Sequence, residues 1–433
     1  MTRINTSFSA CLILAVCWPA LHADDWTRFL GPNGSGIAAG KAVPSNWSLT
    51  ENMQWKVELP GYGSSSPIVV GDKVLVTCYS GYGLDTQQPG DIKNLVRSLV
   101  CFDAASGKQL WKSDVAASPD EDPYKGFITE HGYASSTPTS DGQHVFCFFG
   151  KTGVVAFDLE GKQLWTKNLG NFSDPAKWGD GSSPILVGDL LIVNAGIVGH
   201  KIVALRKDTG EQVWQVENDG FTNTWSTPVL ADVDGHTELV FSIPQKIFAL
   251  DPATGKELWF AQSPITNTVC PSLAHADGVV FAMGGRGGQG IAVRCGGQGD
   301  VSGTHTVWQA PLQAGIGTPI AVQGRLIWSS RGIVTCADCS TGAEVYKERI
   351  GAAEQPGQRR GPAGDYASAL TSGDQIIVIP RNGQAVVLRA GDRFEKIGAG
   401  SFGDDPGPFN ATPAISDGKL FVRTNRALYC IGN

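Results

Sequence analysis

One short unit recurs along nearly the whole chain, and this repetition limits the fold more than any other feature. The clearest copy is STPVLADVDGHTELVFSIPQKIFALDPATGKELWFAQ at 226–262. It opens on Thr227-Pro228, continues through three short β-rich segments, turns at 253–256 and ends on a strand that carries Trp259. Repeats with a period of about 20–50 residues form solenoids, propellers or arrays.

The unit occurs eight times. Its opening dipeptide stands at Ser66-Pro67, Thr137-Pro138, Ser183-Pro184, Thr227-Pro228, Cys270-Pro271, Thr318-Pro319, Ser368-Ala369 and Thr412-Pro413. The first two copies are 71 residues apart and the others 43 to 50, so only the first unit carries a large insertion, from Tyr79 to Ser98. The closing aromatic residue recurs as Trp111, Trp165, Trp214, Trp259, Trp308 and Tyr346, with Phe394 one position out of register.

The strands within each unit are short, and the turns between them are tight. Pairs such as Gly71-Asp72 and Asp141-Gly142 tolerate the positive φ that two-residue hairpins require. Four antiparallel strands per unit and eight units predict an all-β, eight-bladed β-propeller. The eighth copy ends at 430–433 without its closing tryptophan strand, and the matching strand is 52–59, with Trp55 in the expected place. We therefore expect the N-terminal strand to pair with the last blade and close the ring.

The N-terminal residues suggest an exported protein, and the net charge limits its partners. Residues 1–23 resemble a secretory signal peptide, with Arg3, an apolar run at 8–21 and a cleavage site at 21–23. We assign 24–51 to an N-terminal extension and 52–433 to the propeller. Later segments offer no candidate for a membrane span. The net charge of −7, without a basic stripe, argues against nucleic acid as a partner, and we expect a monomer.

The cysteines and the repeated tryptophans are expected to be structural. Cys101, Cys336 and Cys430 align with alanines in other copies, which predicts a small buried residue on a strand. Cys336 and Cys339 have the spacing of a redox or metal pair, but no second pair accompanies them. Disulfide connectivity in an exported chain stays open. Because the tryptophans recur at the same position of the repeat, we expect them to pack between blades rather than stack on a ligand.

Candidate functional residues gather on one face of the predicted ring. The loops before each first strand and between the second and third strands open there, whereas the other face consists mostly of minimal hairpins. The candidates on this loop-rich face are Lys151, Trp178, Asp180, Asn223, Trp225, Asn267, Arg331, Asp365, Arg381 and Asn382. Convergent polar groups among aromatic side chains indicate a binding site. A solvated rim with cations for solubility is the alternative.

Recognisable catalytic and metal motifs are few. The sequence has no G-x-S-x-G, H-E-x-x-H or Walker pattern. The acidic run at 120–122 lacks regular calcium-ligand spacing, and the acidic stretch 232–238 replaces a hairpin turn on the minimal face. His131 lies near several polar loops, as either a structural donor or a general base.

The repeat resembles that of the pyrroloquinoline-quinone (PQQ)-like propellers. Their Ala-x-Asp-x-x-Thr-Gly-Lys-x-x-Trp pattern stands here as ALDPATGKELW at 249–259 and, varied, as CFDAASGKQLW at 101–111. The resemblance covers 52–433. The preceding WTRFLGPNG at 26–34 is similar to the start of a group of exported bacterial proteins of this type.

The resemblance implies two functions. Quinoprotein dehydrogenases hold PQQ and calcium in the funnel, above adjacent cysteines that this chain lacks, whereas BamB-like proteins use the propeller as a protein-binding scaffold without a cofactor. If PQQ binds, Lys151, Arg331 and Arg381 are expected to meet its carboxylates, with Asn382 beside them. Trp178 or Trp225 would stack on its rings. Asp180, Asn223 or Asn267 would supply calcium oxygens, and Asp365 would act as the general base.

We therefore expect a non-catalytic exported scaffold that binds a protein or a small ligand through its loop-rich face. The sequence assigns no cofactor to it with certainty, and PQQ with calcium is the one that the resemblance offers. The alternative is a PQQ- and calcium-dependent dehydrogenase that oxidises an alcohol or a sugar.

Overall fold

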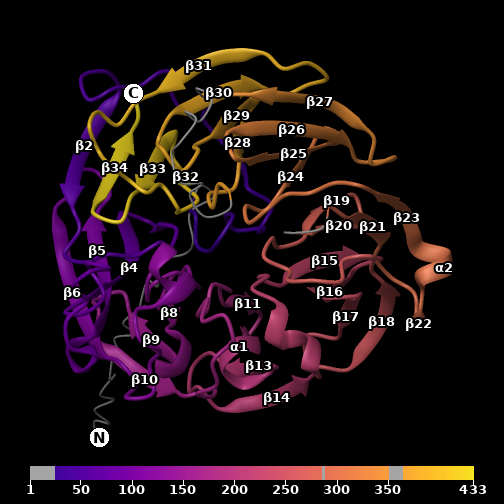
Figure 1. Cartoon of the computed structure of the whole chain (residues 1–433), viewed down its shortest axis with the longest axis horizontal. Helices are drawn as coiled ribbons and strands as arrows, with labels where there is room; N and C mark the ends of the chain where they lie inside the picture. The colour runs from indigo at the N-terminus through magenta and orange to yellow at the C-terminus, as the bar shows by residue number, and fades with distance from the viewer. Residues whose placement is uncertain (1–24, 285–287, 351–363) are drawn as a thin grey trace, which may run out of the picture.

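A computed structural model describes residues 25–284, 288–350 and 364–433. Eight sheets stand around a central axis like the blades of a propeller, as Figure 1 shows. Each blade has four antiparallel strands, with the first strand next to the axis and the fourth at the rim. The predicted eight-bladed propeller is confirmed. The signal-peptide prediction for 1–23 lies outside the described residues.

The strands of the blades follow in chain order. Blade 1 has β3 (Ile68–Val70), β4 (Lys73–Ser80), β5 (Val96–Asp103) and β6 (Gln109–Ala116), and blade 2 has β7 (Thr139–Ser140), β8 (His144–Phe148), β9 (Val154–Asp158) and β10 (Gln163–Lys167). Blade 3 has β11 (Ile185–Val187), β12 (Leu190–Ala195), β13 (Lys201–Arg206) and β14 (Gln212–Glu217), and blade 4 has β15 (Val229–Val233), β16 (His236–Ile243), β17 (Lys246–Leu250) and β18 (Glu257–Gln262). Blade 5 has β19 (Ala274–Ala276), β20 (Val279–Met283), β21 (Gly290–Arg294) and β23 (Thr306–Ala310), and blade 6 has β24 (Ile320–Val322), β25 (Arg325–Ser330), β26 (Ile333–Asp338) and β27 (Glu344–Arg349). Blade 7 has β28 (Leu370–Ser372), β29 (Gln375–Val378), β30 (Ala385–Arg389) and β31 (Lys396–Gly400), and blade 8 has β32 (Ala414–Ser416), β33 (Lys419–Arg423), β34 (Ala427–Ile431) and β2 (Met53–Glu58).

The remaining elements are short. Two strands extend blades 7 and 4, namely β1 (Ile37–Ala38) beside β28 and β22 (Gly299–Asp300) beside β18. The helical turns are η1 (Ile92–Asn94), η2 (Gly126–Glu130), η3 (Gly150–Thr152), α1 (Gly196–Gly199), η4 (Asp219–Asn223) and α2 (Ser302–His305). Within the described residues, no helix is long and apolar enough to cross a membrane.

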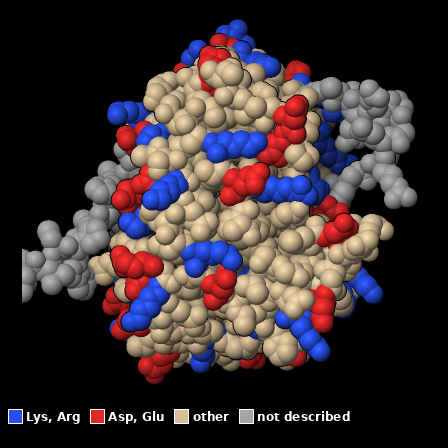
Figure 2. Space-filling view, turned by 90° about the vertical axis from the view of Figure 1, so that its left-hand side faces the viewer, with Lys and Arg blue, Asp and Glu red and all other residues tan. Residues whose placement is uncertain are grey.

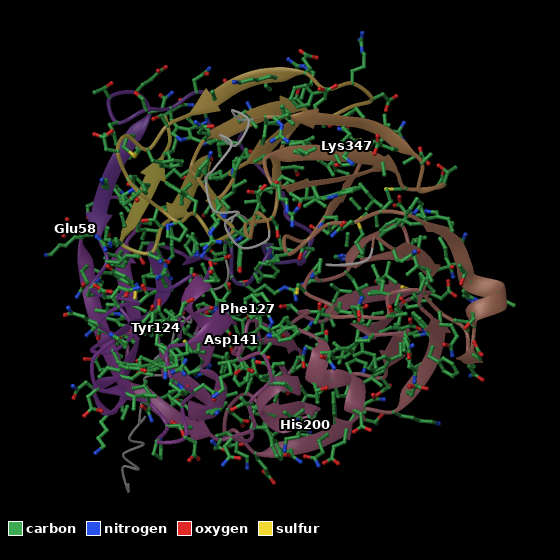
Figure 3. The ribbon with its side chains drawn as sticks, in the orientation of Figure 1. Glu58, Tyr124, Phe127, Asp141, His200 and Lys347 are labelled. Atoms are coloured by element: carbon green, nitrogen blue, oxygen red, sulfur yellow. The ribbon has the colours of Figure 1, made fainter. Side chains whose placement is uncertain are left out.

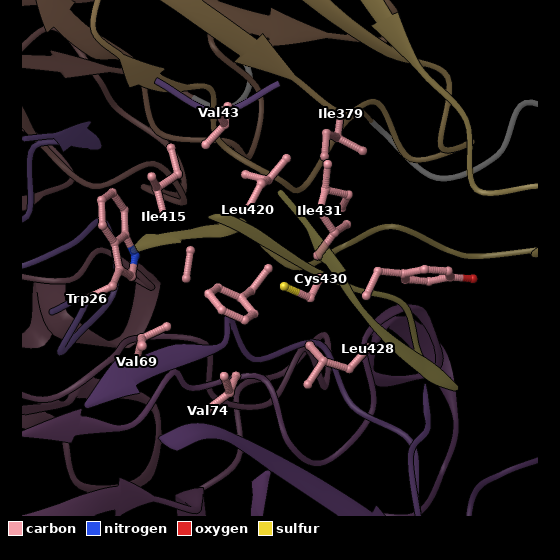
Figure 4. Close-up of a cluster of buried hydrophobic side chains, with 14 of the residues drawn as sticks. Trp26, Val43, Val69, Val74, Ile379, Ile415, Leu420, Leu428, Cys430 and Ile431 are labelled. Carbon is pink, nitrogen blue, oxygen red and sulfur yellow. The ribbon is translucent and has the colours of Figure 1, made fainter. Parts of the chain in front are cut away.

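The two ends of the chain close the ring within blade 8. Strand β2 pairs antiparallel with β34, and Trp55 lies opposite Cys430, as the sequence predicted. A large apolar cluster then joins blade 8 to blades 1 and 7 and to the N-terminal segment, and Figure 4 shows Trp26, Val69 and Leu420 within it. Burial of this apolar surface stabilises the closure by the hydrophobic effect.

The tryptophan that ends a blade docks onto the next blade. The Trp214 indole N–H donates to the Pro252 carbonyl at 3.0 Å. Gly255, at φ +73°, lies beneath the ring, where an added Cβ would stand 2.7 Å from Trp214. Trp55, Trp111, Trp165 and Trp308 repeat the arrangement on Gly107, Gly161, Gly210 and Gly342. The glycine of the third turn therefore leaves room for the neighbouring tryptophan ring, and the packing interpretation is confirmed.

Trp259, which ends blade 4, departs from this rule and finds its partner within its own blade. The third turn of blade 5, on which this ring would otherwise dock, is replaced by the longer segment that contains β22 and α2. The Trp259 indole N–H therefore donates to the buried carboxylate of Glu238 at 2.7 Å, and this carboxylate also accepts the Gly296 N–H at 3.2 Å.

The structure corrects the register of two copies. In blade 5 the hydroxyl that matches Thr227 belongs to Ser272, so the Cys270-Pro271 assignment is two residues early. In blade 7 the position of the closing tryptophan is Gly398, which pairs with Val387, and Phe394 precedes the strand. Glycine is required there because Ser45 of the N-terminal extension lies over the strand, and an added Cβ would stand 2.0 Å from its carbonyl oxygen.

The predicted role of three cysteines is confirmed. Cys101, Cys336 and Cys430 are buried and lie opposite Trp111, Tyr346 and Trp55 across a strand pair. No disulfide bond links the eight cysteines of the described part of the chain.

The rim carries charges of both signs. Figure 2 shows Lys and Arg side chains interspersed with Asp and Glu over the side of the ring, without a large area of one sign. Figure 3 shows Glu58 and Lys347 on outer strands at this rim, whereas Phe127 lies near the axis. The rim therefore offers no strongly charged surface, and the candidate site lies at the axis.

Candidate functional site

A cavity of about 140 Å³ lies on the axis and is surrounded by hydroxyl groups. In blades 2 to 8 the hydroxyl oxygen of the Ser or Thr before the first strand accepts the backbone N–H of the matching residue in the preceding blade. Seven such bonds, of 2.9–3.0 Å, run from the Ser66 N–H to the Thr412 hydroxyl. The Ser/Thr-Pro dipeptide of the repeat is thereby explained, because its hydroxyl links neighbouring blades.

The N-terminal segment 25–38 forms the floor of this cavity at the minimal face. Trp26 pairs with Val69 of blade 1, and the Thr27 carbonyl accepts the Ser140 N–H of blade 2. Across the axis, β1 runs parallel to the first strand of blade 7. Between these anchors Phe29 reaches the cavity.

Arg28 and the glycines hold this segment in shape. The buried Arg28 side chain donates to the carbonyls of Gly31 and Pro32, and burial lowers its pKa to about 10. An added Cβ on Gly34 would stand 2.5 Å from the Arg28 guanidinium, and one on Gly31 2.9 Å from the Trp26 ring. Contacts within the WTRFLGPNG motif thus fix its backbone and hold Phe29 against the axial cavity.

The segment 117–135 forms a cap on the loop-rich side. Its Glu130 carboxylate pairs with Arg381 of blade 7 at 2.8 Å, and the Glu130 carbonyl accepts Nδ2 of Asn410 at 2.8 Å. The Ser64 hydroxyl donates to the His131 carbonyl at 3.0 Å. Burial lowers the pKa of His131 to about 4, so its ring is neutral near pH 7. This favours a structural role for His131.

Two candidate aromatic residues stand beneath this cap with little freedom. Trp178 stacks on Phe127, with ring centroids 3.8 Å apart and planes inclined by 3°. Trp225 meets Trp178 edge to face at 6.4 Å and donates its indole N–H to the Gly179 carbonyl at 2.6 Å. Both rings line the axial cavity. The structure therefore brings Trp178 and Trp225 together.

The candidate lysine and one candidate carboxylate lie in a second, smaller cavity of about 30 Å³. Lys151 is buried and pairs with Asp122 at 3.0 Å, and Arg97 pairs with Glu121 beside it at 2.5 Å. Asp180 faces the same cavity. Burial, and then the nearby Glu121 charge, raise the pKa of Asp180 to about 7. The acidic run at 120–122 thus neutralises cations of its own chain.

The other candidates do not join these cavities. Asp365 is buried and accepts the backbone N–H groups of Gly332 and Arg381 at 3.1 and 3.2 Å, so it fixes two loops. Arg331 and Asn382 are exposed on second-to-third turns. Asn223 and Asn267 are exposed and share a hollow of about 540 Å³ on the loop-rich face, away from Asp180.

The axial cavity does not fit PQQ. Among the described residues, none that lines it is Asp, Glu, Lys or Arg. A fused-ring tricarboxylate would lose its hydration there without an opposing charge, which is unfavourable. The volume is also below the roughly 300 Å³ at which pockets for drug-sized ligands begin. Lys151 and Arg381, which were expected to meet the carboxylates, are already paired.

Sequence reasoning gave no role to Phe29, which lines the cavity at the minimal face, or to Glu130, which anchors the cap to blade 7. The motif at 26–34 was visible, but nothing in it shows that it crosses the axis. Glu130 pairs with a residue five blades further along the chain, a contact that no local pattern encodes.

A family model described as outer membrane protein assembly factor BamB matches residues 95–348, more than half of the chain. The chain belongs to this family of PQQ-like repeat propellers. It is 24% identical over 295 residues to the BamB of Burkholderia pseudomallei, which covers 66% of each chain. It is also 24% identical over 322 residues to a polyvinylalcohol dehydrogenase of Pseudomonas sp, over 60% of this chain and 45% of the enzyme.

Solved structures of the same fold include both kinds of relative. The BamB of Moraxella catarrhalis superimposes with a TM-score of 0.59 at 14% identity, over 87% of this chain and 96% of that one. The quinohemoprotein alcohol dehydrogenase of Comamonas testosteroni has a TM-score of 0.62 at 13% identity, over 94% and 80%. The chain spans 66% or less of the curated relatives, so family membership shows the fold and leaves the function to the site.

Proposed function

We propose that this protein is an exported, non-catalytic scaffold that binds a partner polypeptide on the loop-rich face of blades 3 to 5. The observation that carries the proposal is an exposed aromatic residue held rigidly on that face. Phe172 is 55% exposed and stacks on His200, with ring centroids 4.5 Å apart. Aromatic residues of low conformational freedom are typical binding hot spots.

The surface next to Phe172 supports the same proposal. His200 ends α1, and α1 packs against η4, which leads to Asn223. Asn223 and Asn267 then line the hollow on this face together with Pro244, Thr266 and Thr268, all of them uncharged. An exposed aromatic anchor and an uncharged hollow on the same face match the composition of a protein interface. The BamB relatives, named as outer membrane protein assembly factors, favour a protein partner.

The proposal is tested by replacing Phe172 with serine and measuring the affinity for a partner that co-purifies with the exported protein. Loss of a hot-spot aromatic residue should weaken binding by at least about tenfold. The matched control is Leu164→Ser, which removes a side chain of similar exposure, 43%, from the outer strand β10. Equal affinities for the two variants would place the interface elsewhere.

The dehydrogenase alternative has its own test. Purified exported protein is incubated with PQQ and calcium, and dye reduction is measured with alcohols and sugars as substrates. We expect no activity, because the axial cavity lacks charge and room for this cofactor. Calcium-dependent reduction that is lost in Asp365→Asn would establish the dehydrogenase and restore Asp365 as its base.

A further inference from the structure

Two residues that line the axial cavity each carry a buried polar atom without a hydrogen-bond partner among the described residues. These atoms are the hydroxyl oxygen of Tyr366 and the side-chain carbonyl oxygen of Asn410. Asn410 is only 5% exposed. Buried polar atoms are nearly always satisfied, so each one that is not points to a missing partner.

The chemistry of these two atoms is complementary. The Asn410 amide donates to the Glu130 carbonyl through Nδ2, which fixes the side chain with its oxygen free to accept. Burial raises the pKa of Tyr366, so its hydroxyl keeps its proton and is free to donate. One hydroxyl group on a ligand could therefore donate to Asn410 and accept from Tyr366.

The opposite wall is aromatic. Trp178 and Trp225 belong to the loops before blades 3 and 4, whereas Tyr366 and Asn410 belong to those before blades 7 and 8, on the other side of the ring in Figure 1. The indole N–H of Trp225 is already engaged by the Gly179 carbonyl. The rings therefore offer apolar faces held in place.

We propose that the axial cavity binds a small uncharged aromatic alcohol of the phenol class, with its ring against Trp178 and Trp225 and its hydroxyl between Tyr366 and Asn410. The volume of about 140 Å³ suits one such ring, because a cavity of about 150 Å³ accommodates benzene. The absence of charged side chains among its described lining residues excludes carboxylated analogues of the same size. This site is separate from the surface of Phe172 and does not depend on the partner proposed there.

Phenol itself is the probe, and binding to the purified protein is measured by calorimetry and by the rise in Tm. We expect saturable binding of phenol and none of benzoate. Tyr366→Phe should weaken phenol binding about 3- to 10-fold and leave the Tm of the free protein unchanged, because that hydroxyl bonds to nothing in the protein. Tyr346→Phe is the control, since it removes a buried hydroxyl beside Phe394 at the rim.

Three results would overturn the proposal: binding of benzoate as tight as that of phenol, an unchanged affinity in Tyr366→Phe, or a phenol-soaked crystal whose cavity holds water only. Phe29→Ala provides an independent check on the place, because it enlarges the floor of the cavity. It should let the wider 2-naphthol bind at least tenfold more tightly than it binds the wild type.

Discussion

The charge state of Asp180 offers a sharp test of the electrostatics around the smaller cavity. Burial and Glu121 raise its pKa to about 7, whereas an unfolded aspartate has a pKa near 3.8. Folding therefore takes up a proton between these values, and the contribution of Asp180 to stability falls as the pH rises from about 4 to about 7. Asp180→Asn stays neutral at every pH and should remove this loss.

The size of the effect follows from the shift in pKa. About three units at 1.36 kcal/mol each give an upper limit of about 4 kcal/mol. Asp180 is partly accessible to solvent, which roughly halves this figure. The difference in the free energy of unfolding between Asp180→Asn and the wild type should therefore grow by about 2 kcal/mol from pH 4.5 to pH 8.

Urea denaturation at the two pH values measures this difference. Asp208→Asn, which changes an exposed carboxylate on a hairpin turn, is the control for loss of a carboxylate outside the cavity. If the difference stays constant or falls between pH 4.5 and pH 8, attraction to Arg97 and Lys151 outweighs burial. The account of the cavity would then be refuted.

Two further predictions concern the contacts between blades. Gly255→Ala should be less stable than Gly278→Ala by about 1–3 kcal/mol in urea denaturation, since both have similar positive φ but only the first would press a Cβ against Trp214. Equal losses would mean that the backbone angle alone matters. Thr227→Val should lower the free energy of unfolding by about 1–3 kcal/mol, because it leaves the Ser183 N–H without its acceptor. Thr371→Val, which removes a buried hydroxyl without a partner, should be neutral, and a similar loss in both would contradict the role of the hydroxyl ring.

Much of the fold could be predicted because the contacts between blades depend on residues that recur in the repeat. The contact between neighbouring blades has two marks in the sequence, the closing Trp of one blade and the glycine of the third turn in the next. Either mark is enough to identify a blade. Prediction of the register was wrong where one of these marks is missing. Blade 5 opens on Ser272 after a misleading Cys270-Pro271, and blade 7 has Gly398 in place of the aromatic residue.

The candidate site was predictable only in part. Trp178 and Trp225 could be placed on the loop-rich face because both lie in the loops that precede first strands. The pairing of Arg381 with Glu130 could not, since it depends on how an irregular segment crosses the mouth of the ring. The sequence alone therefore could not show that Arg381 already has an ion-pair partner and is not available to bind a ligand carboxylate.

The closure of the ring also fixes the order in which the molecule can be completed. Strand β2 precedes the strands of blades 1 to 7 in the chain, and β34, its partner, follows them. Until those blades have been synthesised β2 has no partner, and a chain that stops before β34 can never supply one. Pairing of such distant segments is slow. A circular permutant that joins β34 to β2 by a short turn would make blade 8 local, and it should assemble faster without any change in the finished ring.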